Sequence, residues 1–110
     1  MYVYKAKVLD VHDGDTITAL VDLGFRVQTQ LKLRFYGINA PEVTGITKEE
    51  GLKSKNRVEE LILGKDIILK THKDKQEKYG RWLADIYLPD QETSINDLLV
   101  EEKLAVPFMV

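Results

Sequence analysis

The sequence contains no cysteine among its 110 residues. This absence excludes a disulfide framework, a thiolate nucleophile and a zinc–thiolate site. No apolar run reaches the length of a transmembrane helix, so we expect no membrane partner. The opening stretch, Met1-Tyr2-Val3-Tyr4-Lys5, lacks the apolar segment of a signal peptide. A cytoplasmic protein is therefore the default expectation, and a secreted form stays open if the chain has been trimmed.

The sequence also has no excess of positive charge, and its formal net charge is −2. This balance argues against a protein that holds duplex nucleic acid on a broad basic face. It leaves room for an enzyme that grips phosphates with a few arginines. The length, with 44% hydrophobic and 31% charged residues, fits one soluble domain over residues 1-110, and we expect a monomer.

Alternating apolar and polar residues predict five strands. Their ranges are 2–11, 16–21, 26–36, 66–71 and 81–88, with turn-forming residues at His12-Asp13-Gly14-Asp15 and Asp22-Leu23-Gly24. The segment from Lys73 to Lys78 has no apolar anchor and is predicted to be a loop.

Two helices are expected. Thr47-Lys48-Glu49-Glu50 is typical of a capping box, and Gly64 stands where a helix of this length would end. Leu52, Val58, Leu61 and Ile62 follow at roughly helical spacing, and a short second helix is expected to start at Ser94. A helix between the third and fourth of five strands is the order of an OB-fold barrel, so we predict an α+β, mainly β, OB-fold with a short C-terminal helix.

Three polar segments are placed to meet one another. Arg34 lies at the end of the third strand, and the irregular segment after it ends in Pro41-Glu42. Asp13-Gly14-Asp15-Thr16 forms the first turn, and Lys78-Tyr79-Gly80-Arg81 precedes the fifth strand. Functional residues are common on loops that a rigid scaffold holds in place.

Taken in this order, the three segments resemble the staphylococcal-nuclease-like, or thermonuclease, family. The resemblance covers about residues 8 to 105 and implies the same OB-fold. It also implies a calcium-dependent, sugar-nonspecific endonuclease that hydrolyses DNA and RNA, leaves 3′-phosphate ends and prefers single-stranded substrate. One departure concerns Asn39, because active members of the family carry Asp there. The C-terminal end also lacks the tyrosines that flank the substrate base in the family.

The resemblance assigns roles to individual residues. Asp15, the Asn39 side chain and the Ala40 carbonyl match the metal ligands, and calcium prefers such oxygen donors. Arg34 and Arg81 match the arginines that clamp the phosphate, a task that suits the planar guanidinium. Glu42 matches the general base or water-positioning group. Lys78 and Tyr79 are expected to contact the substrate.

Simpler interpretations of these residues remain open. Asp13 is interpreted as a turn residue or an indirect support rather than a ligand, and Trp82 as a core residue rather than a base platform. His12 and His72 have no partner in the sequence for acid–base work, and we expect them to be exposed or capping residues. Arg34 and Arg81 could each be an ordinary surface cation. Only their occurrence together with Glu42 favours a functional role.

Two other functions compete with the nuclease. One is a catalytically impaired OB-like module that binds single-stranded nucleic acid or a protein partner. The other is a sequence whose activity was altered on purpose at Asn39. The joint presence of Arg34, Glu42 and Arg81 favours the enzyme.

Overall fold

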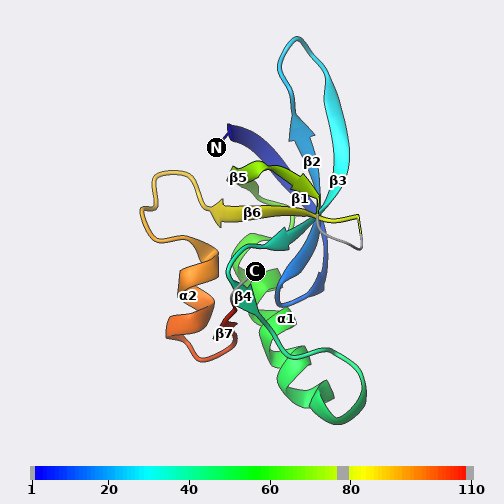
Figure 1. Cartoon of the computed structure of the whole chain (residues 1–110), viewed down its shortest axis with the longest axis vertical. Coiled ribbons are helices and arrows are strands. Elements are labelled where there is room, and N and C mark those ends of the chain that lie inside the picture. Colours follow the sequence, from blue (N-terminus) through cyan, green and yellow to red (C-terminus); the bar gives the residue numbers. More distant parts are fainter. Residues whose placement is uncertain (1, 77–79, 109–110) are drawn as a thin grey trace.

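The structure is a computed structural model that describes residues 2–76 and 80–108. Five strands close into a barrel in the order β1-β2-β3-β6-β5 (Figure 1). Their bounds are β1 Tyr2–Asp13, β2 Thr16–Asp22, β3 Gln28–Phe35, β5 Asp66–Gln76 and β6 Trp82–Tyr87. All neighbouring strands are antiparallel except β3 and β6, which run parallel. The OB-fold expected from the sequence is confirmed.

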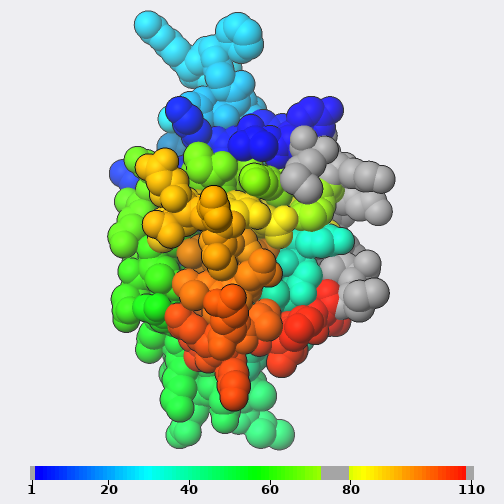
Figure 2. Space-filling view, turned by 90° about the vertical axis from the view of Figure 1, so that its left-hand side faces the viewer, coloured from blue at the N-terminus to red at the C-terminus, as the bar shows by residue number. Residues whose placement is uncertain are grey.

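The core fills the barrel because alternate side chains of each strand point inward. Its largest fully buried side chains come from all five strands and both helices, and they include Phe35, Ile17, Leu33, Ile62, Ile67, Leu69, Ile86 and Leu99. Trp82 is half-buried and packs against this core, as the sequence indicated. The β2–β3 hairpin extends well beyond the barrel (Figures 1 and 2), and its tip carries the fully exposed Phe25.

The first helix, α1, spans Lys48–Ile62 and follows a short 3-10 turn, Gly45–Thr47. The capping box predicted at its start does not form. Thr47 occupies the N-cap position, but its hydroxyl donates a hydrogen bond to the Glu42 carbonyl oxygen at 2.9 Å. The buried face of α1 also differs from the prediction in its first half, because Gly51 and Ser54 are buried there while Leu52 is exposed.

The second helix, α2, spans Ile95–Glu101. Ser94 caps it as expected, since its hydroxyl accepts a hydrogen bond from the Asp97 amide at 3.0 Å. Two short strands, β4 (Ile38–Asn39) and β7 (Val106–Pro107), pair outside the barrel and were not predicted as strands. They join the segment after β3 to the C-terminal end, next to α1 in Figure 1.

The structure corrects the expected loop after residue 72. Strand β5 continues to Gln76, which pairs with Trp82 of β6 after an irregular stretch of the ladder. Backbone pairing with β6 thus extends β5 through a polar segment whose sequence does not predict a strand. Lys78 and Tyr79 lie outside the described residues. Within the described residues, no helix has the length and apolar character needed to cross a bilayer.

Candidate active site

The ends of three barrel strands bring the candidate residues together. Thr16 at the start of β2 is paired with Arg34 near the end of β3. Arg34 is in turn paired with Leu83 of β6, which places Arg81 close by. The segment of residues 38–43 after β3, here called the site loop, carries the other candidates.

Asp15 is the buried centre of this group, with 4% of its surface exposed. Its Oδ2 accepts a hydrogen bond from the Ala40 amide at 2.9 Å and lies 2.9 Å from a terminal nitrogen of Arg34. Its Oδ1 accepts a hydrogen bond from the Thr16 hydroxyl at 3.0 Å. A buried carboxylate is stable only when its oxygens are paired in this way. Asp15 therefore fixes the site loop to the start of β2.

Arg34 connects Asp15 with the site loop. Its second terminal nitrogen donates to the Ile38 carbonyl at 3.1 Å and to the Asn39 side-chain oxygen at 3.3 Å. Its guanidinium also lies 5.7 Å from the centre of the Phe108 ring, within the range of a cation–π contact. Only a side chain with several donors in one plane can hold these partners at once.

Arg81 joins the same network through a residue that the sequence did not single out. Its NH1 donates to the Thr16 hydroxyl oxygen at 3.2 Å, and Thr16 donates onward to Asp15. Thr16 is the last residue of the Asp-Gly-Asp-Thr motif, so its place next to Asp15 was the available signal. The two arginines are thereby linked through one hydrogen-bonded chain.

Glu42 is exposed and lies near this network. The pKa of the half-buried Asp13 is raised, and burial is the largest cause. The negative charges of Asp15 and Glu42 raise this pKa further, while the positive charges of His12 and Arg81 lower it. Glu42 stands two residues after Ala40, whose amide bonds Asp15, so the chain itself keeps Glu42 near this group. Asp13 itself ends β1 beside the turn, in keeping with an indirect role.

The two histidines lie outside this network. His12 is half-buried rather than exposed, and its Nε2 lies 2.7 Å from the Thr18 hydroxyl oxygen. The expectation for His72 was wrong, because its ring is half-buried, stacks on Tyr36 with centroids 3.5 Å apart and bonds Asp85 at 2.9 Å. Packing between distant segments produces this arrangement, and the local sequence gives no sign of it.

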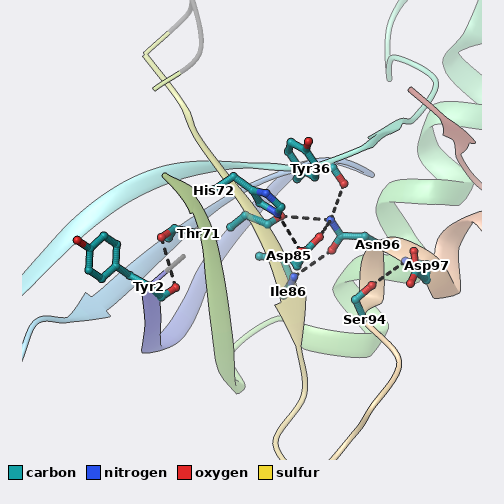
Figure 3. Close-up of polar contacts among 10 residues, drawn as sticks. Tyr2, Tyr36, Thr71, His72, Asp85, Ile86, Ser94, Asn96 and Asp97 are labelled. Atoms are coloured by element: carbon teal, nitrogen blue, oxygen red, sulfur yellow. Dashed lines mark hydrogen bonds and ion pairs between the residues drawn. The ribbon is translucent and has the colours of Figure 1, made fainter. Parts of the chain in front are cut away.

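Asn96 of α2 anchors the start of the segment that leads into the site loop (Figure 3). Its amide nitrogen donates to the Tyr36 carbonyl at 2.9 Å and to the Ala84 carbonyl at 3.2 Å, while its oxygen accepts from the Ile86 amide at 3.0 Å. One buried side chain thus satisfies backbone groups of two segments. The sequence analysis did not identify it.

Two glycines allow α1 to approach the site closely. A Cβ at Gly51 would lie 2.1 Å from the Glu42 carbonyl oxygen and 2.7 Å from the Val43 nitrogen. A Cβ at Gly14 would lie 2.6 Å from the Ser54 Cβ and 3.0 Å from the Ala40 Cβ. The helix therefore supports both the turn that precedes Asp15 and the backbone of Glu42.

We expect Gly51→Ala to destabilise the protein, although alanine normally stabilises a helix interior by about 1 kcal/mol over glycine. The added methyl group meets backbone atoms that cannot rotate away, and overpacking of this kind costs about 1–3 kcal/mol. Thermal unfolding measures the effect. Asn56→Ala, at an exposed position of the same helix, is the control and should stabilise slightly. A rise in melting temperature for Gly51→Ala would show that the close contact does not constrain the site loop.

The oxygens around Arg34 are the possible metal ligands. The Asp15 carboxylate and the Asn39 side-chain oxygen both lie against one guanidinium, so they face a common cationic group. Among the described residues, no three His, Cys, Asp or Glu side chains gather as a metal site. The donor set fits a hard cation such as Ca²⁺ in atom type, but it supplies a single formal negative charge. An ion there would share its ligands with Arg34.

Residues 32–110 match the family model described as staphylococcal nuclease homologue. The chain belongs to this family. The matched segment includes Arg34, Asn39, Glu42 and Arg81 and begins after Asp15. The staphylococcal nuclease family accounts for the closed barrel with two helices, as the motifs indicated.

The chain is also similar to a protein of unassigned activity. An uncharacterized protein of Methanocaldococcus jannaschii, MJ1439, is 31% identical over an alignment of 115 positions that covers 84% of this chain. The match covers 53% of that protein, so this chain spans about half of its length.

Proposed function

We propose that the protein is a calcium-dependent, sugar-nonspecific nuclease that hydrolyses phosphodiester bonds of DNA and RNA and leaves 3′-phosphate ends. The observation that carries this proposal is the hydrogen-bonded chain from Arg81 through Thr16 and Asp15 to Arg34, beside the exposed Glu42. It combines two guanidinium groups with a solvent-accessible carboxylate. Such a combination suits a reaction in which negative charge grows on phosphoryl oxygens.

Each residue has a proposed task. Arg34 and Arg81 hold the substrate phosphate and stabilise its developing charge. Glu42 orients the attacking water and accepts its proton, for which its exposure gives the water access. For Lys78 and Tyr79 we propose contact with the substrate, and this proposal rests only on the membership of the family. Single-stranded DNA or RNA is the proposed preferred substrate on membership of the family, and the net charge of −2 argues against a broad basic face for duplex.

Calcium is proposed to bind through the Asp15 carboxylate, the Asn39 side-chain oxygen and the Ala40 carbonyl. When bound, such an ion supplies Lewis-acid stabilisation of phosphoryl oxygens. The Ala40 amide already donates a hydrogen bond to Asp15, so the backbone at this residue is held beside the carboxylate.

The test is digestion of labelled single-stranded DNA by the purified protein, first with calcium and then with a chelator. Calcium-dependent fragments ending in 3′-phosphate are the expected products. Intact DNA in both reactions, at protein concentrations that bind it, would sink the nuclease proposal.

One observation favours a second candidate, an impaired module that binds single-stranded nucleic acid or a protein partner. Arg34 already places a positive charge against Asp15 and Asn39, and Asn39 adds no negative charge to attract a metal. A protein of this kind would bind single strands in the digestion experiment without cleaving them.

The substitution Asn39→Asp separates these candidates. It restores a carboxylate at an exposed position with little change in size, so packing should hardly change. Calcium affinity and cleavage rate should both rise, because more ligand charge strengthens calcium binding. Isothermal titration and a nuclease assay measure the two effects. Unchanged affinity together with an unchanged rate would show that residue 39 does not face the ion.

A further inference from the structure

A pocket of about 470 Å³ adjoins the candidate active site on the side of α1. The site loop contributes Asn39, Ala40 and Pro41 to its lining, and α1 and the segment after α2 form its other walls. The volume lies within the range of roughly 300–1,000 Å³ that is typical of ligand pockets. Asn39 and Ala40 are also proposed metal ligands, so the pocket and the proposed cleavage site share two residues.

Two lysines from different elements line the pocket. Lys53 belongs to α1, and Lys103 follows α2. Within the described part of the chain, neither forms an ion pair. Glu50 is the acidic residue of the lining. The lining therefore carries one positive charge in excess.

Glu102, the C-cap residue of α2 next to Lys103, is engaged by Arg57, which also pairs with Glu60. Both carboxylate oxygens of Glu102 accept hydrogen bonds from Arg57, at 2.8 and 2.9 Å. The hydrogen bond from Arg57 is the main reason why the pKa of Glu102 is lowered. Because Glu102 is engaged on the α1 side, the positive charge of Lys103 remains available to a ligand.

The backbone of Lys103 is a further observation. Its φ is 62°, in the left-handed region, at the position after the C-cap of α2. Glycine is the usual residue there, because any side chain is strained in this conformation. A lysine also interacts favourably with the helix dipole at this end. If Lys103 binds a ligand, Lys103→Gly should weaken binding without lowering stability. If Lys103 only stabilises the end of the helix, the same substitution should lower stability without changing binding.

We propose that this pocket is a second subsite for the substrate strand, in which Lys53 and Lys103 bind the phosphate of a nucleotide next to the one that is cleaved. The apolar wall formed by Pro41, Leu104 and Val106 contacts its sugar and base. The ligand class is thus the backbone of single-stranded nucleic acid. This inference rests on the proposed function and adds the expectation that a longer strand binds more tightly than a single nucleotide.

The test measures binding of a short fluorescent oligothymidylate by anisotropy, in chelator to prevent cleavage and at several salt concentrations. Lys53→Gln with Lys103→Gly should weaken binding roughly tenfold. The slope of log affinity against log salt should fall by about 0.7 for each lysine removed. Binding of thymidine monophosphate, which carries only the one phosphate held at the cleavage site, should not change. Lys103→Gly should preserve or raise the melting temperature, and Lys103→Arg should retain binding.

Two controls make the outcome decisive. Lys65→Gln removes an exposed lysine between α1 and β5, outside the pocket, and should leave oligonucleotide affinity unchanged. Arg81→Gln probes the cleavage site itself. If Arg81→Gln weakens binding and the double lysine variant does not, the second subsite is refuted while the proposed function stands. If neither weakens binding, both are refuted. A lower melting temperature for Lys103→Gly with unchanged affinity would assign Lys103 a structural role only.

Discussion

Replacing Arg34 by alanine is expected to destabilise the protein by about 3–5 kcal/mol, the usual effect of removing one partner from a buried ion pair. Only 11% of the Arg34 side chain and 5% of the Asp15 side chain are exposed. Without the guanidinium, Asp15 would remain as a buried charge with only the Ala40 amide and the Thr16 hydroxyl as partners. Cleavage should be lost as well. Urea unfolding followed by the fluorescence of Trp82, the single tryptophan, measures the stability.

A double-mutant cycle identifies the cause of this loss. Asp15→Asn should destabilise the wild type, because its amide cannot accept both hydrogen bonds and pair with Arg34. In the Arg34→Ala background the same change should recover part of the stability, since it removes the unpaired charge. Additive effects of the two substitutions would mean that the two side chains do not stabilise each other.

Replacing Glu42 by glutamine is expected to lower turnover about 10²–10⁴-fold, the usual contribution of a general base. The side chain is exposed, so the free energy of unfolding should change by less than about 0.5 kcal/mol. Glutamine keeps the size of the side chain and removes its ability to take a proton. Steady-state kinetics on single-stranded DNA, with calcium titration of the same variant, separates catalysis from metal binding.

Glu49→Gln provides the matched control for this experiment. Glu49 is an exposed carboxylate in the first turn of α1, outside the network around Asp15. Its replacement should leave turnover unchanged. Equal losses in both variants would indicate a general effect of charge, and full activity of Glu42→Gln would exclude the assigned role.

Local sequence was enough to predict the barrel and the order of its strands. Alternation along residues 2–11 indicates one buried face, and a buried face specifies the register of a strand. The ends of the helices were also predictable where one residue sets the geometry. Gly64 takes a φ of 74° after α1, and Ser94 caps α2. The candidate residues at the strand ends were found because the motifs around Asp15, Arg34 and Arg81 are ordered.

Side-chain partners were beyond the reach of the sequence. Thr47 was expected to cap α1, yet its hydroxyl bonds Glu42, because the 3-10 turn brings that carbonyl nearer. By propensity alone, glycine at position 51 is unfavourable in a helix, whereas the fold requires the absence of a Cβ there because the Glu42 backbone lies against it. Strand β5 extends through a polar stretch because β6 supplies backbone partners.

The sequence by itself therefore determined the OB-fold, its two helices and the set of polar residues at one end of the strands. Only the tertiary structure decided how these residues pair: Arg34 with Asp15 and Asn39, Arg81 with Thr16, and Asn96 with the Tyr36 carbonyl. The reason is physical. Periodicity and turn chemistry act between residues close in the chain, whereas a buried charge or amide takes whichever partner the folded chain brings within hydrogen-bond distance.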